Sequence, residues 1–293
     1  MTAPATEDTR MSSWRLLMSN PVTVISAVVL LAVVIVAVCA RWIAHFGLND
    51  IDVPNALQSP SGTHWFGTDE LGRDVFSRVL VAVQASIQVA VISVAFAAAV
   101  GVTIGLVAGY RGGWVDTVFM RVVDVMFAFP VLLLALAVVA ILGPGVTTTI
   151  LAIGIVYTPI FARVSRASTL SVRVEPYVAV SRTMGTGHGY ILRRHILPNI
   201  AGPLIVQTSL SLAFAILAEA ALSFLGLGIQ PPQPSLGRMI FDSQGFVTLA
   251  WWMAVFPGVA IFVTVLAFNL FGDGLRDVLD PRQRTMIEAR SKQ

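Results

Sequence analysis

The chain of 293 residues is 56% hydrophobic and only 12% charged, with a net charge of +3 and a mean hydropathy of +0.81. Soluble domains carry about 25% charged residues, so this composition excludes a water-soluble enzyme. A bilayer requires every backbone N–H and C=O to be paired, which leaves helices or a closed barrel. Barrel strands alternate apolar and polar residues, whereas residues 22–40 are apolar on every face. We predict an all-α integral membrane protein.

Five uncharged runs follow one another along the chain, at 22–40, 79–110, 125–162, 196–218 and 243–272. A spanning helix needs about 20 residues. The third run would be about 57 Å long as one helix, nearly twice the hydrocarbon core, and Gly143-Pro144-Gly145 interrupts it. Five runs therefore predict six transmembrane helices. The first run is too long for a typical cleaved signal peptide, so we expect it to remain as a helix.

These runs divide the chain into an N-terminal segment (1–20), a first transmembrane helix (21–46), an outer loop (47–78), a five-helix core (79–272) and a tail (273–293). The arginines indicate the orientation. Placing both termini in the cytoplasm puts 15 of the 19 basic residues on the inner side, as the excess of positive charge in cytoplasmic loops requires.

The polar segment 163–200 is longer than a simple connection between two helices needs to be. It carries six arginines. We predict a short helix from Glu175 to Met184, ended by a glycine-rich stretch, and a second from Tyr190 to Leu197, ended by Pro198. The glycines Gly185, Gly187 and Gly189 lack the strand and the Lys-Ser/Thr of a phosphate loop, so ATP hydrolysis would have to come from another subunit.

Residues 175–185, followed by His195-Ile-Leu-Pro-Asn199, resemble the "EAA" loop of permease subunits in ABC-type importers. Blocks 64–78, 219–234 and 268–282 resemble the C-type permease of dipeptide, oligopeptide or nickel importers. The resemblance implies the type I importer permease fold in a bacterial inner membrane. It also implies a homologous permease, two ATP-binding subunits that hold ATP and Mg, and an extracytoplasmic substrate-binding protein as partners. We expect no catalytic residue, metal site, bound cofactor or nucleic-acid contact in this chain.

The resemblance further implies that the 175–198 loop is the coupling helix that docks on an ATPase subunit. Ala179, Val180 and Ser181 stand where the family has Glu-Ala-Ala, and Glu175 lies one turn earlier on the same face. The residues expected to couple to the ATPase are Glu175, Tyr177, Val178, Ala179, Ser181, Arg182, Gly185, Leu197 and Pro198.

Glu219 is an acid inside an apolar run, where a carboxylate costs several kcal/mol unless it is paired or hydrated. Two interpretations stay open: a structural contact with the partner subunit or the outer loop, and a role in a cavity or gate. In the acidic outer loop we expect Asp69, Glu70, Arg73 and Asp74 to contact a partner.

Two local patterns concern packing. Gly101, Gly105 and Gly109 recur every four residues and predict close approach of another span. Arg121 and Asp124 lie three residues apart and can pair on one helix face.

Two other classes of function have little support. An intramembrane zinc enzyme would need His-Glu-x-x-His, which is absent from the sequence. A stand-alone carrier would need clustered ionisable residues near the bilayer centre, and Glu219 is alone there. An importer of peptides is the leading hypothesis, with nickel or another small solute as the alternative.

Overall fold

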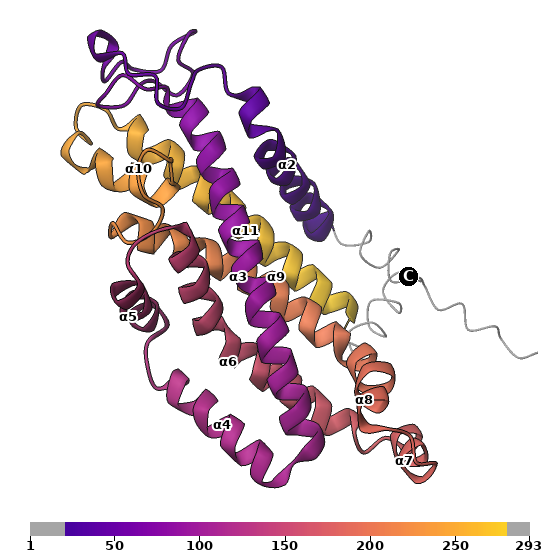
Figure 1. Cartoon of the computed structure of the whole chain (residues 1–293). Helices are drawn as coiled ribbons and strands as arrows, with labels where there is room; N and C mark the ends of the chain where they lie inside the picture. The colour runs from indigo at the N-terminus through magenta and orange to yellow at the C-terminus, as the bar shows by residue number, and fades with distance from the viewer. Residues whose placement is uncertain (1–20, 280–293) are drawn as a thin grey trace, which may run out of the picture.

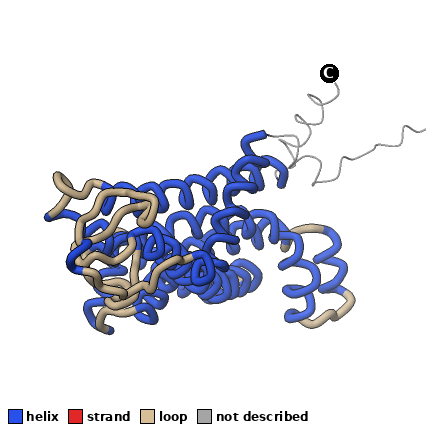
Figure 2. Tube along the Cα trace, turned by 90° about the horizontal axis from the view of Figure 1, so that it is seen from above, coloured by secondary structure: helices blue, strands red, loops and turns tan. Residues whose placement is uncertain are grey.

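The structure is a computed structural model that describes residues 21–279. The predicted segment 1–20 and the end of the predicted tail, 280–293, lie outside the described residues. Within 21–279 the regular elements are helical (Figure 2), and the one β-bridge joins Thr68 to Asp74. This confirms the all-α prediction for the described part of the chain.

Five helices are long and apolar enough to cross a bilayer. Each contains a predominantly apolar stretch of about the length that the hydrocarbon core requires. They are α2 (Pro21–Ile43), α3 (Val75–Arg111), α6 (Val146–Val172), α9 (Ala201–Phe224) and α11 (Trp252–Leu279).

The sixth span is a bent pair rather than one straight helix. Helices α4 (Gly113–Phe127) and α5 (Val131–Leu142) meet at 93°, so the described residues hold five candidate spans, or six when this bent pair is counted as one span. The predicted break at Gly143-Pro144-Gly145 is confirmed, since α5 ends at Leu142. A second break, at Pro130, was not predicted; this residue lacks a backbone N–H and disfavours the helical conformation at Phe129.

The remaining helices are short. They are η1 (Val53–Asn55), α7 (Pro176–Thr183), α8 (His188–Tyr190), the π-helix η2 (Ile191–Ile196), η3 (Leu197–Ile200), α10 (Leu236–Asp242) and η4 (Ser243–Gly245). The bounds of α7 confirm the predicted first short helix of the 163–200 segment. The prediction that Pro198 ends the second was wrong, because Pro198 lies in the first turn of η3 and the chain stays helical from His188 to Phe224.

Several boundaries also differ from the predicted divisions. Helix α3 begins at Val75, inside the predicted outer loop 47–78, because the Asp74 side chain caps its first turn. Helix α6 continues to Val172, so the predicted loop 163–200 begins as a helical extension of the span. Helix α11 extends past residue 272.

Helix α3 runs along the whole molecule, with α6 beside it (Figure 1). Its three glycines, Gly101, Gly105 and Gly109, are buried against α6. A methyl group added at Gly105 would collide with the Ala162 carbonyl oxygen and lie 2.6 Å from Ser165 Cβ. The structure confirms that this stripe packs against another span.

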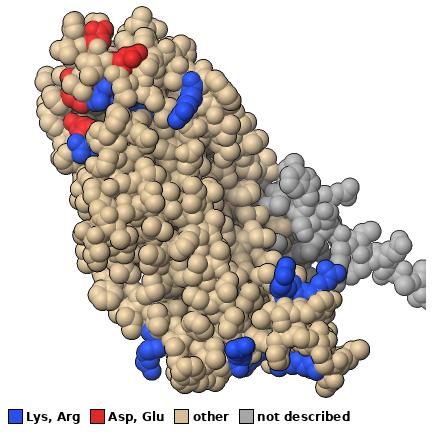
Figure 3. All heavy atoms as spheres, in the orientation of Figure 1, with Lys and Arg blue, Asp and Glu red and all other residues tan. Residues whose placement is uncertain are grey.

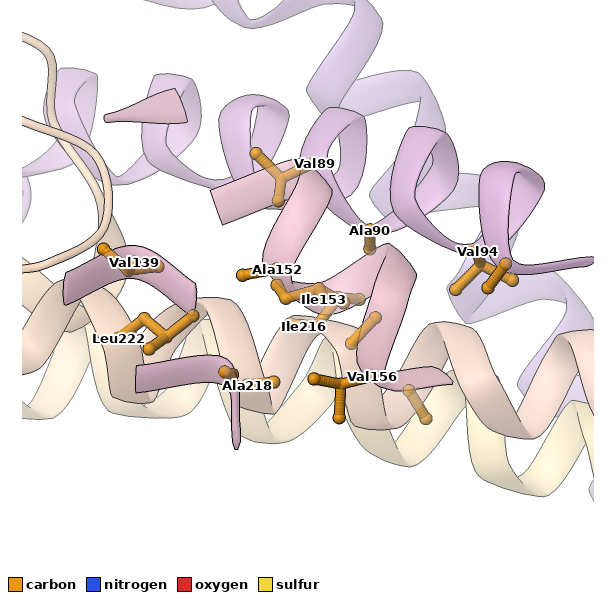
Figure 4. Close-up of a cluster of buried hydrophobic side chains, with 14 of the residues drawn as sticks. Val89, Ala90, Val94, Val139, Ala152, Ile153, Val156, Ile216, Ala218 and Leu222 are labelled. Atoms are coloured by element: carbon orange, nitrogen blue, oxygen red, sulfur yellow. The ribbon is translucent and has the colours of Figure 1, made fainter. Parts of the chain in front are cut away.

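The main core lies where α3, α5, α6 and α9 meet (Figure 4). Val89 and Val94 of α3, Val139 of α5 and Ile216 of α9 all belong to this one cluster, with Val139 and Val94 at its opposite ends. Alanine is the commonest buried residue in this cluster, and its small side chain lets the backbones approach closely.

Charges gather at the two ends of the bundle. On the face shown in Figure 3 the acidic side chains lie at one end, arginines lie at both ends, and the long middle band shows neither. We call the end with the outer loop and α10 the α10 end, and the opposite end with α7 the α7 end (Figure 1). A band without charges is what the hydrocarbon core demands.

The glycine stripe gives a first prediction. Gly105→Ala should lower the free energy of unfolding by about 2 kcal/mol, because the added methyl overpacks the α3–α6 contact. The measurement is thermal or denaturant unfolding of the purified chain in detergent.

Gly258→Ala in α11 is the matched control, since a Cβ there would meet no atom within 4 Å. It should be neutral or stabilising by up to about 1 kcal/mol because alanine favours the helix. Equal destabilisation by both variants would show that the α3–α6 contact tolerates a Cβ.

Candidate functional site

Helix α7 presents an apolar face that no other part of residues 21–279 covers. Tyr177, Val180 and Met184, spaced three and four residues apart, are 41%, 55% and 79% exposed. Residues at this spacing share one face of a helix. Exposed contiguous apolar surface commonly marks an interaction site.

The opposite face of α7 fixes the helix to the bundle. Val178 is fully buried in a cluster with Tyr110 of α3 and with Ile191, Ile196 and Ile200 of the segment that leads into α9. The short helix is therefore attached through its buried side to two spanning helices.

Polar contacts reinforce this attachment. The Tyr110 hydroxyl lies 3.0 Å from His188 Nδ1, and the Arg182 guanidinium lies over the Tyr110 ring at 4.6 Å from its centroid. Such a cation–π contact adds electrostatic attraction to the ring face. The end of α3 thus holds both the last turn of α7 and the turn that follows it.

The turn after α7 depends on Gly185. Its φ is +76°, a conformation that favours glycine. The Gly185 N–H donates to the Arg182 carbonyl and the Thr186 N–H donates to the Ser181 carbonyl, which satisfies two carbonyl groups at the helix end. Glu175 is the N-cap residue, and its backbone carbonyl accepts the first bonds of α7 while its side chain makes no capping bond.

The other predicted coupling residues lie on α7 and on η3. Ala179 and Arg182 are exposed, Ser181 is half-buried, and Leu197 and Pro198 are exposed on η3. The structure therefore brings the nine predicted coupling residues to the α7 end.

Glu219 is fully buried in α9, with 0% exposure, and two serine hydroxyls donate to its carboxylate. Ser86 of α3 donates to Oε2 at 2.5 Å, and Ser223, one turn further along α9, donates to Oε1 at 2.7 Å. Ser223 also accepts the Ile229 N–H at 3.1 Å. The acid thus joins α3, α9 and the chain after α9.

The outer loop uses two of its predicted contact residues internally. Asp69, 4% exposed, accepts the backbone N–H groups of Leu71 and Arg73, each at 2.9 Å, and the Arg73 Nε at 2.7 Å. Asp74, also 4% exposed, accepts the Ser77 N–H at 2.8 Å and contacts His64 Nδ1 at 2.9 Å. Both carboxylates shape the loop and the start of α3.

Glu70 and Arg73 are half-buried and pair at 2.9 Å. Burial, together with the neighbouring charge of Asp69, raises the pKa of the Glu70 carboxyl. Of the predicted outer contacts, these two retain surface for a partner.

A family model described as the inner membrane component of binding-protein-dependent transport systems matches residues 101–285. A second, the N-terminal transmembrane domain of oligopeptide transport permease C, matches residues 11–60. The chain belongs to this family of inner membrane transport components. It is a permease subunit of an ABC importer located in the inner membrane, as the resemblance of the coupling loop implied.

Three curated relatives cover nearly the whole chain. A dipeptide transport system permease protein (DppC) of Alkalihalophilus pseudofirmus is 42% identical over 289 residues, which are 97% of this chain and 95% of the relative. A probable D,D-dipeptide permease (DdpC) of Escherichia coli K12 is 43% identical, covering 91% and 90%. A glutathione permease (GsiD) of Escherichia coli O157:H7 is 45% identical, covering 92% and 89%.

A solved structure is similar in fold. The MetNI methionine ABC transporter in an inward-facing conformation aligns with a TM-score of 0.57 at 17% identity, over 69% of this chain and 96% of that chain. This likeness supports the type I permease fold.

Sequence reasoning about this permease missed the partners of its key residues. Ser86 and Ser223 hold Glu219, and Tyr110 holds the coupling loop, yet none was singled out. Ser223 lies four residues from Glu219, so helical spacing could have found it. Ser86 lies 133 residues away, and no local pattern identifies such a pair.

The predicted pair of Arg121 and Asp124 was wrong. Asp124 instead pairs with Arg163 of α6 at 2.9 Å. Within residues 21–279, no group of three or more histidine, cysteine, aspartate and glutamate side chains could hold a metal ion.

The buried acid gives a second prediction. Glu219→Ala should destabilise the chain by about 3 kcal/mol, because it leaves a cavity and removes the acceptor of two buried hydroxyls. Glu219→Gln should cost about 1 kcal/mol, since its amide oxygen still accepts one bond and its amide nitrogen can donate to the other serine. Unfolding in detergent measures both.

Leu217→Ala is the control on the same helix, because Leu217 is 41% exposed and faces outward. It should cost the isolated chain much less than Glu219→Ala. A loss as large as that of Glu219→Ala would mean that α9 responds to any truncation.

Proposed function

We propose that this permease forms half of the translocation path of an ATP-driven importer of short peptides, together with a homologous permease subunit. The supporting observation is the exposed apolar face of α7, fixed through its buried side to the spanning helices. The names of the relatives, which include two dipeptide permeases and a glutathione permease, favour peptides as the substrate class.

ATP hydrolysis belongs to two partner subunits in this proposal. The sequence has no phosphate loop, so the energy must reach the membrane helices through contact. ATP and Mg are bound by the partners, and the chain itself needs no cofactor. An extracytoplasmic binding protein delivers the peptide at the α10 end, where Glu70 and Arg73 remain available for contact.

Helix α7 docks on an ATPase subunit with Tyr177, Val180 and Met184 inserted in an apolar groove. Movement of the docked helix then passes to three spans. The segment joins α6 and α9 covalently, and Tyr110 clamps it to α3 as well. Because packed helices move as rigid bodies rather than bending continuously, a displaced α7 tilts this group against the second permease.

Glu219 keeps α3 and α9 together during this movement. Its Oε2 accepts from Ser86 of α3, so separation of the two helices would leave this oxygen of a buried acid without its partner. We assign it this linking role within the chain in preference to a contact with the second permease.

Docking gives a third prediction. Val180→Asp should reduce co-purification of the ATPase subunits with the permease complex by about tenfold or more, because it places a charge in an apolar contact. Val180 is 55% exposed, so the substitution leaves the core of the chain intact.

Val247→Asp is the matched control, with the same change at a residue 49% exposed near α10, at the far end of the bundle. It should leave co-purification unchanged. Unaltered ATPase binding by Val180→Asp would contradict α7 docking, whatever the substrate proves to be.

The substrate class is tested by uptake. Proteoliposomes containing both permeases, the ATPases and the binding protein should accumulate labelled dipeptide or glutathione in the presence of ATP. Nickel supplied alone should neither accumulate nor stimulate ATP hydrolysis. Uptake of nickel without peptide uptake would overturn the peptide assignment and leave the importer architecture in place.

A further inference from the structure

A cavity of about 350 Å³ opens at the α7 end, between the last residues of α3 and the turn after α7. It is lined by Tyr110, Arg111, Arg182 and His188. Two guanidinium groups, an imidazole and a phenol therefore surround one space. In the proposed coupling mechanism His188 serves as the partner of Tyr110, whereas Arg111 has no role.

The charge around this cavity is positive and uncompensated. None of the four lining residues is acidic, and within residues 21–279 neither Arg111 nor Arg182 forms an ion pair. The nearby acid at the start of α4, Asp116, is bound by Arg166 through two contacts of 2.5 and 2.6 Å. Arg173 adds positive charge at the same turn, with its Nη1 2.7 Å from the Gly109 carbonyl oxygen.

Three of the four lining groups are held by contacts with one another. Tyr110 is 8% exposed, its hydroxyl contacts His188, and its ring supports the Arg182 guanidinium. An arginine held on an aromatic ring presents its planar set of N–H donors in one direction. Planar, paired donors are the groups that recognise phosphate oxygens with two parallel bonds.

The position of the cavity at the end of α3 fits the level of a lipid headgroup. The apolar part of α3 ends at Tyr110, and Arg111 is the last residue of the helix. Trp114, three residues further and 78% exposed, begins α4, and Tyr190 is 58% exposed on α8. Tryptophan and tyrosine concentrate where the hydrocarbon meets the headgroups, and basic pockets at that depth bind acidic lipid headgroups.

We propose that this cavity binds a phosphate-class anion, the headgroup phosphate of an acidic membrane phospholipid. The lipid phosphate would lie between Arg111 and Arg182, with its acyl chains along the apolar surface of α3 and α4. This site goes beyond the proposed transport function and does not depend on it, because the lining residues all belong to one chain.

The test is lipid retention by the purified full chain, measured by native mass spectrometry from mild detergent. Phosphatidylglycerol and phosphatidylcholine with the same acyl chains are the probes. We expect the wild-type chain to retain phosphatidylglycerol preferentially. Arg111→Gln should reduce that preference by about tenfold, since it removes charged donors to phosphate.

Arg193→Gln is the matched control, because Arg193 is exposed at the same end and does not line the cavity. It should retain the wild-type preference. Arg182→Gln provides a second cavity variant should Arg111→Gln unfold, with circular dichroism as the check on folding. No preference in the wild-type chain, or equal losses in the cavity and control variants, would overturn the proposal.

Adding inorganic phosphate or the ATPase subunits distinguishes a bound lipid phosphate from other occupants of the cavity. Displacement of the lipid by millimolar inorganic phosphate would support the anion site with soluble phosphate as its occupant. Release of the lipid when the ATPase subunits bind would show that an acidic side chain of that partner takes the cavity, and would overturn the lipid assignment. Val180→Asp is the control for this measurement, because Val180 lies outside the cavity. In this variant, which should not dock the ATPase, the lipid should stay bound when ATPase subunits are added.

Discussion

The close approach of α3 and α6 is the contact on which the rest of the structure depends. Three glycines on α3 remove the side chains that would separate the two helices, so that backbone atoms of α6 occupy their place. In a bilayer, where burial from water cannot drive one helix against another, such van der Waals contact is a main source of attraction. With α3 fixed along the whole bundle, Ser86 is placed beside Glu219 and Tyr110 is placed beside the coupling loop.

The parts of this fold that follow a local rule could be predicted from the sequence. Apolar runs of sufficient length gave the number of spans, and Gly143-Pro144-Gly145 gave the start of α6, because length and chain-breaking residues act locally. Pro176 and Gly185 bounded α7 for the same reason. The bend at Pro130 could not be predicted in this way, because a proline does not always break a membrane helix. Pro159 and Pro257 lie inside helices of this same chain.

The site residues also fall into two groups, those set by local sequence rules and those set by contacts between distant parts of the chain. Exposure of the α7 face could be expected once the loop was recognised, whereas the clamp by Tyr110 joins residues 78 positions apart in sequence. In the outer loop, residues that were expected to contact a partner turn out to bond within the chain. Asp69 and Asp74 looked like surface charges in an acidic loop, but polar groups near the membrane must satisfy one another, and these two carboxylates bind backbone N–H groups and neighbouring side chains.

The π-helix at Ile191–Ile196 lets two isoleucines face the same neighbour. Ile191 and Ile196 are both fully buried in the cluster under α7, although residues five apart on an α-helix point about 140° away from each other. The wider π turn accommodates one additional residue and so brings the two side chains toward the same side of the chain. Because the chain stays helical from His188 to Phe224, one continuous rod presents these isoleucines to the coupling loop and Glu219 to Ser86 of α3.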